Sequence, residues 1–305
     1  MLTKSKQQLQ HYRLCALLIL AACCFRTLSV LTEPKDTPRP AVQAQIEPMA
    51  YESLEAPSFV VSPDPPDLSL VDIDNRCGAV FAEQELFDLP LHFTITEEPC
   101  VLIIHTHGSE AYSDTPGYRS TDPEKNMVRI GKEMAQQLNA AGIPTIHDTT
   151  LHDETRGYDM AYSQAASAIS AYLEQYPQIQ MVIDIHRDAV EDSKGTQKAM
   201  TTEIDGRSYA QLLLVMGTDL SGQAHPRWEE NLSFAMKLQA QLRMEHPDFM
   251  RQTSLRSSRY NEHLTPFSIL LEVGSAGNTQ EEALRSADYF ALQLAQLLKT
   301  IDASS

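Results

Sequence analysis

The stretch VLIIHTHGSEAY, residues 101–112, runs from four apolar residues directly into histidines and a glutamate. His107 and Glu110 stand three residues apart, and both side chains are of kinds that bind metals or transfer protons. A second apolar stretch, IQMVIDIHRD at residues 179–188, ends in a similar way and carries His186. Strands usually end in turn-forming residues, so these two endings indicate chemistry rather than packing alone.

A third apolar stretch, FSILLEVG at residues 267–274, carries Glu272 near its end. Each of the three stretches has the length and composition of a buried strand in a parallel sheet. Ligands of open parallel sheets bind at the carboxyl ends of the strands. We therefore expect these polar residues, far apart in the sequence, to meet at one edge of a sheet.

Two histidines and one carboxylate are a typical catalytic zinc set, in which water takes the fourth position. We expect His107, Glu110 and His186 to bind the metal. Zinc lowers the pKa of its bound water to about 7, and a separate carboxylate must then accept the proton and return it to the leaving amine. Glu272, on a different strand, suits that role.

Alternatives remain for the acidic residues of this set. Glu124, at the start of the next expected helix, competes with Glu110 for the place of third ligand. Glu272 has two other interpretations: it is itself a ligand, or it forms an ion pair with Arg187. A carboxylate near a metal serves equally well as ligand, base or salt-bridge partner, so residue type alone does not separate these roles.

Other polar residues near the strand ends are expected to support the site. His105, Asp184 and Arg187 are candidates for orienting a ligand or binding substrate. Asp184 suits the orientation of an imidazole, and Arg187 suits a carboxylate or one of the neighbouring aspartates. His147 and His152 lie near the end of the next expected strand, and loop histidines are usually solvated.

Strands and helices alternate along the chain from about residue 100. Hydrophobic periodicity predicts strands at 100–105, 143–148, 179–188 and 267–274, helices at 126–141, 159–176, 228–245 and 279–300, and a hairpin within 201–217 that turns at Asp205 and Gly206. This alternation predicts an α/β fold with a mostly parallel sheet and helices on both faces.

The chain has 305 residues, of which 42% are hydrophobic, and its formal net charge is -17. This length allows one sizeable domain with additional segments. An acidic surface repels nucleic acid and anionic lipid head groups, so we expect neither as a partner.

The N-terminal segment resembles an export signal or a membrane anchor. Lys4, Lys6 and Arg13 precede the apolar run LCALLILAACCF. We predict a cytoplasmic tail at 1–13 and a single-pass anchor at 14–31, just long enough to cross a bilayer. Two alternatives are a lipoprotein signal cut before Cys23 and a plain cleaved signal. All three place the rest of the chain outside the cytoplasm, with a Pro-rich spacer at 32–74 and a catalytic domain at 75–305.

Cys77 and Cys100 are the two cysteines outside the apolar segment. In an oxidising compartment two thiols can pair. The sequence leaves open whether they form a disulfide or remain two separate thiols.

Four motifs carry a resemblance to a known family: HTHGSEAY, NMVRIGKEMAQQL, DIHRDA and LLEVGSAGNTQEEALRSA. Together they resemble the stage II sporulation protein P family of cell-wall hydrolases over roughly residues 98–300. One departure is SAGN after Glu272-Val-Gly, where a glycine-rich run is expected. This departure concerns substrate contacts and leaves the metal site intact.

The resemblance implies a fold similar to that of zinc-dependent N-acetylmuramoyl-L-alanine amidases. It also implies peptidoglycan as substrate, cleavage of the amide between muramic acid and the stem peptide, and an alternative or second endopeptidase activity on cross-links. By analogy the chain acts in engulfment during endospore formation, beside a lytic transglycosylase. Two rival classes are a catalytically silent wall-binding module and a serine hydrolase using Ser109, although the G-x-S-x-G motif is missing.

Overall fold

The computed structural model of the chain describes residue 62 and residues 64–304. The expected anchor, the alternative lipidation site and most of the spacer lie outside these residues. The described helices are α2 (Glu83–Phe87), α3 (Met127–Ala140), α4 (His152–Thr155), α5 (Ala161–Gln175), α6 (Trp228–Arg243) and α7 (Gln280–Ser304), with four short 3-10 turns at Leu68–Leu70, Pro116–Tyr118, Tyr158–Met160 and Glu262–Leu264.

A seven-stranded sheet forms the centre of the domain, in the order β1-β8-β7-β9-β4-β2-β3. Its strands are β1 (Ile73–Asn75), β2 (Val101–Ile104), β3 (Thr145–His147), β4 (Met181–Asp188), β7 (Leu212–Gly217), β8 (Thr253–Arg256) and β9 (Ile269–Ser275). β3, β2, β4 and β9 run parallel to one another, and β7, β8 and β1 run parallel to one another in the opposite direction. The predicted α/β fold with a mostly parallel sheet is confirmed.

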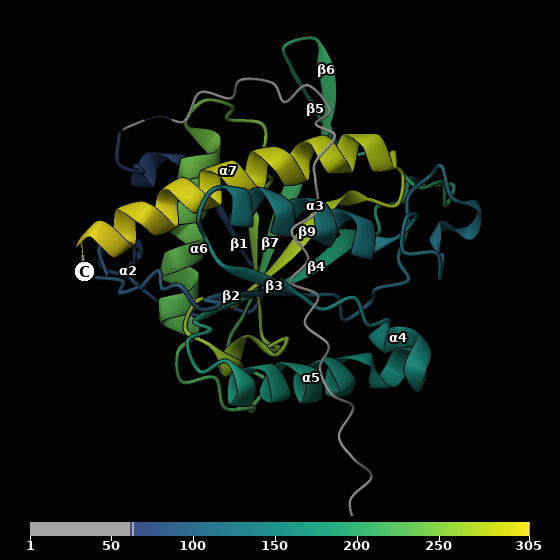
Figure 1. The fold of residues 1–305 in the computed structure, drawn as a ribbon. Coiled ribbons are helices and arrows are strands. Elements are labelled where there is room, and N and C mark those ends of the chain that lie inside the picture. Colours follow the sequence, from purple (N-terminus) through teal and green to yellow (C-terminus); the bar gives the residue numbers. More distant parts are fainter. Residues whose placement is uncertain (1–61, 63, 305) are drawn as a thin grey trace, which may run out of the picture. The chain divides into compact units, whose positions relative to one another are not determined.

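Helices cover both faces of the sheet, with α3 and α7 on one side and α5 on the other (Figure 1). The sequence of α3 explains its placement, because its apolar residues recur at helical spacing and are buried: Met127, Val128, Ile130, Met134 and Leu138. The Asn126 side chain accepts a hydrogen bond from the Val128 N–H and caps the helix. β2 is buried along its whole length between these helical layers, as its continuous apolar run predicts.

The folded domain begins earlier than Asn75, the boundary expected from composition. β1 starts at Ile73 and pairs in parallel with β8, and a 3-10 turn at Leu68–Leu70 precedes it. The Arg243 guanidinium donates to the Leu70 carbonyl oxygen over 3.1 Å and ties this segment to α6. The short edge strand could not be recognised from the sequence. It follows a proline-rich segment, and three residues are too few to show the alternation typical of a strand.

The predicted hairpin exists but is shorter than expected. β5 (Thr201–Ile204) and β6 (Arg207–Ala210) pair antiparallel around Asp205 and Gly206, both with positive φ. The rest of the apolar run does not continue the hairpin. It forms β7, which enters the central sheet antiparallel to β9.

Cys77 and Cys100 are free thiols far apart in the sheet. Cys77 follows edge strand β1, and Cys100 precedes β2, five strand positions away. At the usual strand spacing this separation is about 24 Å, whereas a disulfide needs Cα atoms within about 7 Å. The structure therefore excludes the disulfide that the sequence left open.

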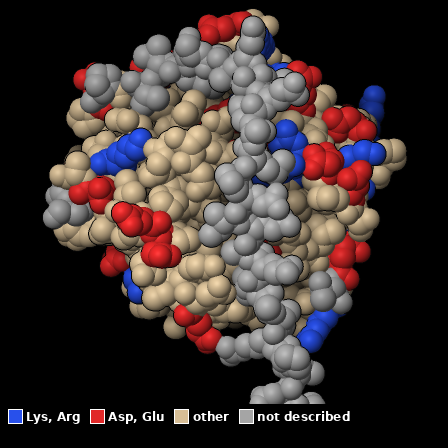
Figure 2. Space-filling model, in the orientation of Figure 1, with Lys and Arg blue, Asp and Glu red and all other residues tan. Residues whose placement is uncertain are grey.

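The face shown in Figure 2 carries acidic and basic side chains interspersed, without a continuous basic patch among the described residues. In the same part of the chain, no helix is both long and apolar enough to span a bilayer.

Candidate metal and catalytic site

The topology brings the three polar strand ends together. β4 lies between β2 and β9, and all three run in the same direction, so their carboxyl ends share one edge. Asp184 is level with Ile104, and His186 is level with Glu272. Level residues on neighbouring strands point to the same face, so His186 and Glu272 are side-by-side neighbours there.

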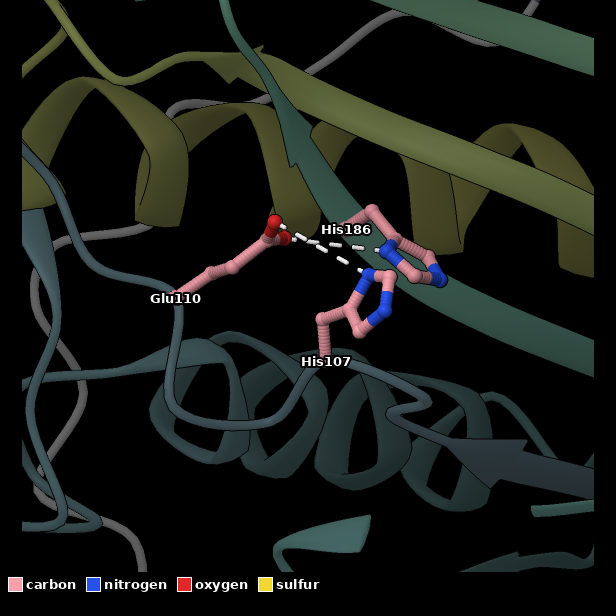
Figure 3. Close-up of side chains that lie close together, drawn as sticks. All are labelled: His107, Glu110 and His186. Carbon is pink, nitrogen blue, oxygen red and sulfur yellow. Dashed lines mark ion pairs between the residues drawn. The ribbon is translucent and has the colours of Figure 1, made fainter. Parts of the chain in front are cut away.

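His107, Glu110 and His186 form a buried cluster whose candidate ligand atoms lie within 4.8 Å of one another. Figure 3 shows the two imidazoles and the carboxylate pointing toward a common centre. His107 Nδ1 is 4.0 Å from Glu110 Oε1, and His186 Nδ1 is 3.6 Å from Glu110 Oε2. Among the described residues this is the only such group of three or more metal-binding side chains.

This set fits zinc in chemistry and in spacing. Imidazole nitrogen and carboxylate oxygen bind Zn²⁺ at about 2.0–2.2 Å, so adjacent ligands of a tetrahedral site are about 3.4 Å apart. The two measured separations are slightly larger. The third separation, between the two imidazole nitrogens, is at most 4.8 Å, so side-chain movements of about one ångström bring the three atoms to the spacing of a tetrahedral site.

The electrostatics of two ligands favour the forms that bind a metal. Burial, and then the neighbouring His186, lower the pKa of His107, so its imidazole is neutral at pH 7. Burial alone opposes charge on Glu110, but His186 and then Arg187 outweigh it and lower the pKa of Glu110. His186 is different, because burial is outweighed by Asp184 and Glu110, which together hold the pKa of His186 well above its ordinary value. A cation bound at His186 Nδ1 therefore displaces a proton.

Asp184 and Arg187 support the cluster from either side. His186 Nε2 lies 3.0 Å from Asp184 Oδ1, which leaves Nδ1 turned toward Glu110. Asp184 is held in turn by the backbone N–H and the hydroxyl of Thr106, at 2.8 and 2.6 Å. A carboxylate behind a histidine ligand fixes its orientation and raises its basicity.

Arg187 pairs with the candidate ligand Glu110 rather than with the aspartates. Its NH1 lies 3.6 Å from Glu110 Oε1, and its backbone N–H donates to Glu110 Oε2 over 3.3 Å. The same guanidinium donates to the carbonyl oxygens of Ala111 and Tyr118. Arg187 therefore fixes both the carboxylate and the loop that carries it. Met127 N–H, at the start of α3, donates to the Glu110 carbonyl oxygen and completes this support.

Glu272 is beside the cluster without belonging to it. Burial raises the pKa of Glu272 to about 8, although the neighbouring His186 acts in the opposite direction. Its Oε2 is out of reach of solvent and has no hydrogen-bond partner among the described residues. No ion pair joins Glu272 to Arg187 in that part of the chain. With this pKa the carboxyl is mostly protonated at pH 7, but a cation held by the neighbouring cluster would favour its ionised form, which is the form that can accept a proton.

His105 is not part of the cluster. Its Nε2 lies 2.8 Å from His147 Nε2, and its Nδ1 lies 3.4 Å from the Ile185 carbonyl oxygen. Gly131 of α3 makes room for this pair, because a Cβ atom there would lie 2.4 Å from His105 Nε2. Burial lowers the pKa of His105 to about 4, so the two rings share a hydrogen bond as neutral imidazoles. His105 thus packs β2 against α3 instead of supporting the ligands directly.

The sequence analysis missed two tyrosines at the site. The Tyr158 ring stacks on His107 with centroids 4.1 Å apart, and Tyr162 meets His107 edge-on at 5.5 Å. Tyr158 begins the 3-10 turn Tyr158–Met160 that leads into α5, and Tyr162 lies four residues later in the first turn of α5. This i, i+4 pair of aromatic residues was a usable signal.

The residues of the two competing assignments, the alternative ligand Glu124 and the alternative nucleophile Ser109, interact with other side chains. Glu124 is on the surface, 3.6 Å from Arg129 and 3.3 Å from Lys132, and is not in the cluster. The Ser109 hydroxyl donates to Asp153 over 2.6 Å and lies beside Arg119, with no histidine among its hydrogen-bond partners in the described chain. A serine nucleophile needs a base within hydrogen-bond reach, so this arrangement does not favour a serine hydrolase.

The family model of stage II sporulation protein P (SpoIIP) matches residues 69–295 of this chain. The chain belongs to this family. A curated relative, stage II sporulation protein P of Bacillus subtilis (strain 168), is 27% identical over 210 residues, which cover 64% of this chain and 50% of the relative. The chain thus spans about half the length of the curated relative it matches.

Two solved structures that are similar to the chain are structures of amidases. The CwlD amidase from Clostridioides difficile, in complex with the GerS lipoprotein, has a TM-score of 0.41 and 16% identity, covering 66% of this chain and 99% of that one. The N-acetylmuramoyl-L-alanine amidase AmiC2 of Nostoc punctiforme has a TM-score of 0.38 and 17% identity, covering 65% and 96%.

Proposed function

We propose that this protein is a peptidoglycan hydrolase, a zinc-dependent N-acetylmuramoyl-L-alanine amidase that cleaves the amide between muramic acid and the stem peptide. The observation that carries the proposal is the buried cluster of His107, Glu110 and His186 at the carboxyl ends of β2 and β4, in a chain of the SpoIIP family. A silent wall-binding module needs no such arrangement of metal-type side chains.

The roles of the residues follow from their positions. His107, Glu110 and His186 would hold the zinc, which when bound supplies a Lewis acid that lowers the pKa of a water molecule. Asp184 keeps the His186 ring in its binding orientation. Glu272 accepts the proton from the attacking water and returns it to the leaving amine, since its Oε2 is free of other partners among the described residues.

The biological setting is part of the same proposal. Family membership supports a role in sporulation. Action in engulfment, beside a lytic transglycosylase, is the finer part of this proposal. The basic residues before the apolar run at 14–25 support attachment to the membrane, with a lipidated Cys23 as the alternative. In either arrangement the catalytic domain is outside the cytoplasm.

Mass spectrometry of the fragments released from purified peptidoglycan tests the reaction. Free stem peptides with an intact N-terminal amine are expected from an amidase. Fragments in which cross-links are split, with the peptide still joined to muramic acid, would instead assign the protein as an endopeptidase. Metal analysis of protein purified without chelator should find about one zinc per chain, and its absence would contradict the metal-dependent mechanism.

A further inference from the structure

A groove extends from the candidate active site across the open face of the sheet. Its cavity measures about 880 Å³ and reaches from Glu272 and Tyr162 to the edge strand β1 at Asp74. Glu272 is level with Leu213 of β7, and Val215 is level with Ser254 of β8, so these strands present one continuous face to the groove. A molecule that reacts beside Glu272 therefore has room to extend over β7 and β8.

Part of the floor of the groove is apolar, although most of its exposed lining is polar. Leu213, Val215 and Leu270 form a small cluster separate from the main core, with Tyr260 packed against it. Tyr260 and Asn261 both have positive φ, 45° and 64°, which is an uncommon conformation for residues other than glycine. The Asn261 side chain holds this strained turn by donating to the Tyr162 carbonyl oxygen over 2.9 Å. Strain of this kind persists where the surroundings enforce it, often at a binding site.

One cation of the groove has no anionic partner. Arg251 pairs with Asp188 at 2.7 Å, and Arg76 pairs with Asp74. Arg243 lies 3.9 Å from Asp72 and also donates to the carbonyl oxygens of Leu70 and Met250.

Arg256 is half-buried and donates from Nε to the Ser254 hydroxyl over 2.8 Å, and it forms no ion pair within the described chain. An uncommitted guanidinium is notable in a chain with a net charge of -17. Its planar fork is suited to a carboxylate.

The spacing between Arg256 and the reacting end of the groove fits a peptide. Glu272 pairs with Leu213, whereas Arg256 pairs with Gly217, four residues further along β7 and on the next strand. Two strand spacings and four residues place the two Cα atoms about 16 Å apart. An extended chain covers about 3.3–3.6 Å per residue. With the length of the arginine side chain allowed for, about three to five peptide residues span the distance.

We propose that this groove binds the peptide portion of the substrate, an acidic peptide in extended conformation, and that Arg256 binds a carboxylate about three to five residues from the scissile amide. The inference rests on the proposed function and adds a specificity site to it. The apolar part of the floor contacts the aliphatic parts of the peptide, and the arginine selects peptides that carry the carboxylate at this distance.

The test compares the full chain with its variants Arg256→Gln and Arg207→Gln. Arg207 is an exposed residue of the β5–β6 hairpin and serves as the matched control. A hydrogen bond to a charged group typically corresponds to a factor of about 10–100, so Arg256→Gln should raise KM by that factor. The zinc content and kcat should change little, and Arg207→Gln should leave KM unaltered. Arg256→Lys keeps the charge without the fork and should fall between wild type and Arg256→Gln.

The substrate supplies the second arm of the experiment. When the peptide carboxylate is converted to an amide, wild type and Arg256→Gln should have the same KM. An equal KM on the unmodified substrate would overturn the proposal. A lower KM in Arg256→Gln would also overturn the proposal. That result would mean that Arg256 binds an acidic segment of this chain, such as the stretch at 32–61, which competes with the substrate.

Binding measured without turnover separates this inference from the proposed function. Calorimetry with an acidic stem peptide and the full chain should show weaker binding to Arg256→Gln than to wild type, even if no wall bond is cleaved. Peptide binding that is the same in both proteins would refute the groove assignment, whatever the reaction proves to be.

Discussion

Glu272→Gln should separate the proton acceptor from the metal ligands. Glu272 is beside His186 but outside the cluster of three ligands, so its replacement should leave zinc bound. Glutamine keeps the shape of the side chain and cannot accept the proton. General acid–base catalysis contributes about 10²–10⁴-fold, so kcat should fall by that factor, equivalent to about 3–5 kcal/mol in the barrier.

The fold should tolerate this change. Glu272 Oε2 has no hydrogen-bond partner among the described residues, so the substitution removes no protein hydrogen bond. It introduces a buried amide N–H, which costs about 1–3 kcal/mol if it finds no acceptor. It also removes a carboxyl group whose pKa is raised to about 8 because burial disfavours its ionised form. The two effects oppose each other, so we expect a change of less than about 2 kcal/mol in the free energy of unfolding.

The measurement pairs zinc content with turnover in three variants. His107→Ala removes one of three protein ligands and should lose both metal and activity. Glu124→Gln changes an exposed carboxylate that pairs with Arg129 and should resemble wild type in both. If Glu272→Gln loses its zinc as His107→Ala does, Glu272 is a ligand and the assignment is wrong. If it retains full turnover, another group accepts the proton.

Three further predictions concern the support of the site, the helices and the thiols. Asp184→Asn should weaken zinc binding by about 10–100-fold in a chelator competition, and unchanged affinity would mean that Asp184 serves only the backbone of the loop. Burial and the nearby Glu133 raise the pKa of Asp288 to about 7, so the folded state retains a proton that the unfolded state loses near pH 4. Its stabilising effect is present at low pH and is lost as pH rises through about 7, by at most about 1.4 kcal/mol per pH unit. Thermal unfolding of Asp288→Asn should depend less on pH between 4 and 7, and an unaltered slope would contradict this. Alkylation in denaturant without reductant should label both Cys77 and Cys100 as free thiols, because Cys100 is buried in the folded domain, and a disulfide between them would refute the strand order.

The central strands could be predicted because their signals are local. β2 and β4 are continuous apolar runs, and their endings differ from ordinary turns. The helix α3 has both a cap at Asn126 and a helical apolar period. These features depend only on residues that are neighbours in the sequence. Once the strands are placed, general rules of chain connection predict that β2 and β4 run parallel and that His107 and His186 lie close together.

The far side of the sheet was not predictable in the same way. β1 and β8 are three and four residues long, and β7 runs antiparallel to β9 although nothing in its apolar sequence indicates a direction. Short strands are specified by the partner they pair with rather than by their own composition. The Gln211 N–H still bonds to the Met200 carbonyl oxygen in the register of the hairpin, and the chain enters the central sheet only at Leu212.

The same limitation explains which site residues were predicted and which were not. His107, Glu110 and His186 were identifiable because their types match a metal and their strands had to adjoin. The pairing of His105 with His147 depends on β3 lying at the edge beside β2 and on the absence of a side chain at Gly131, which no local pattern reveals. Chemistry that resides in residue type is visible in a sequence, whereas the direction in which a side chain points is decided by packing. The candidate metal-binding residues could therefore be identified from residue types and strand order. The groove beyond Glu272 could be identified only from the structure, because its lining depends on how the strands pair.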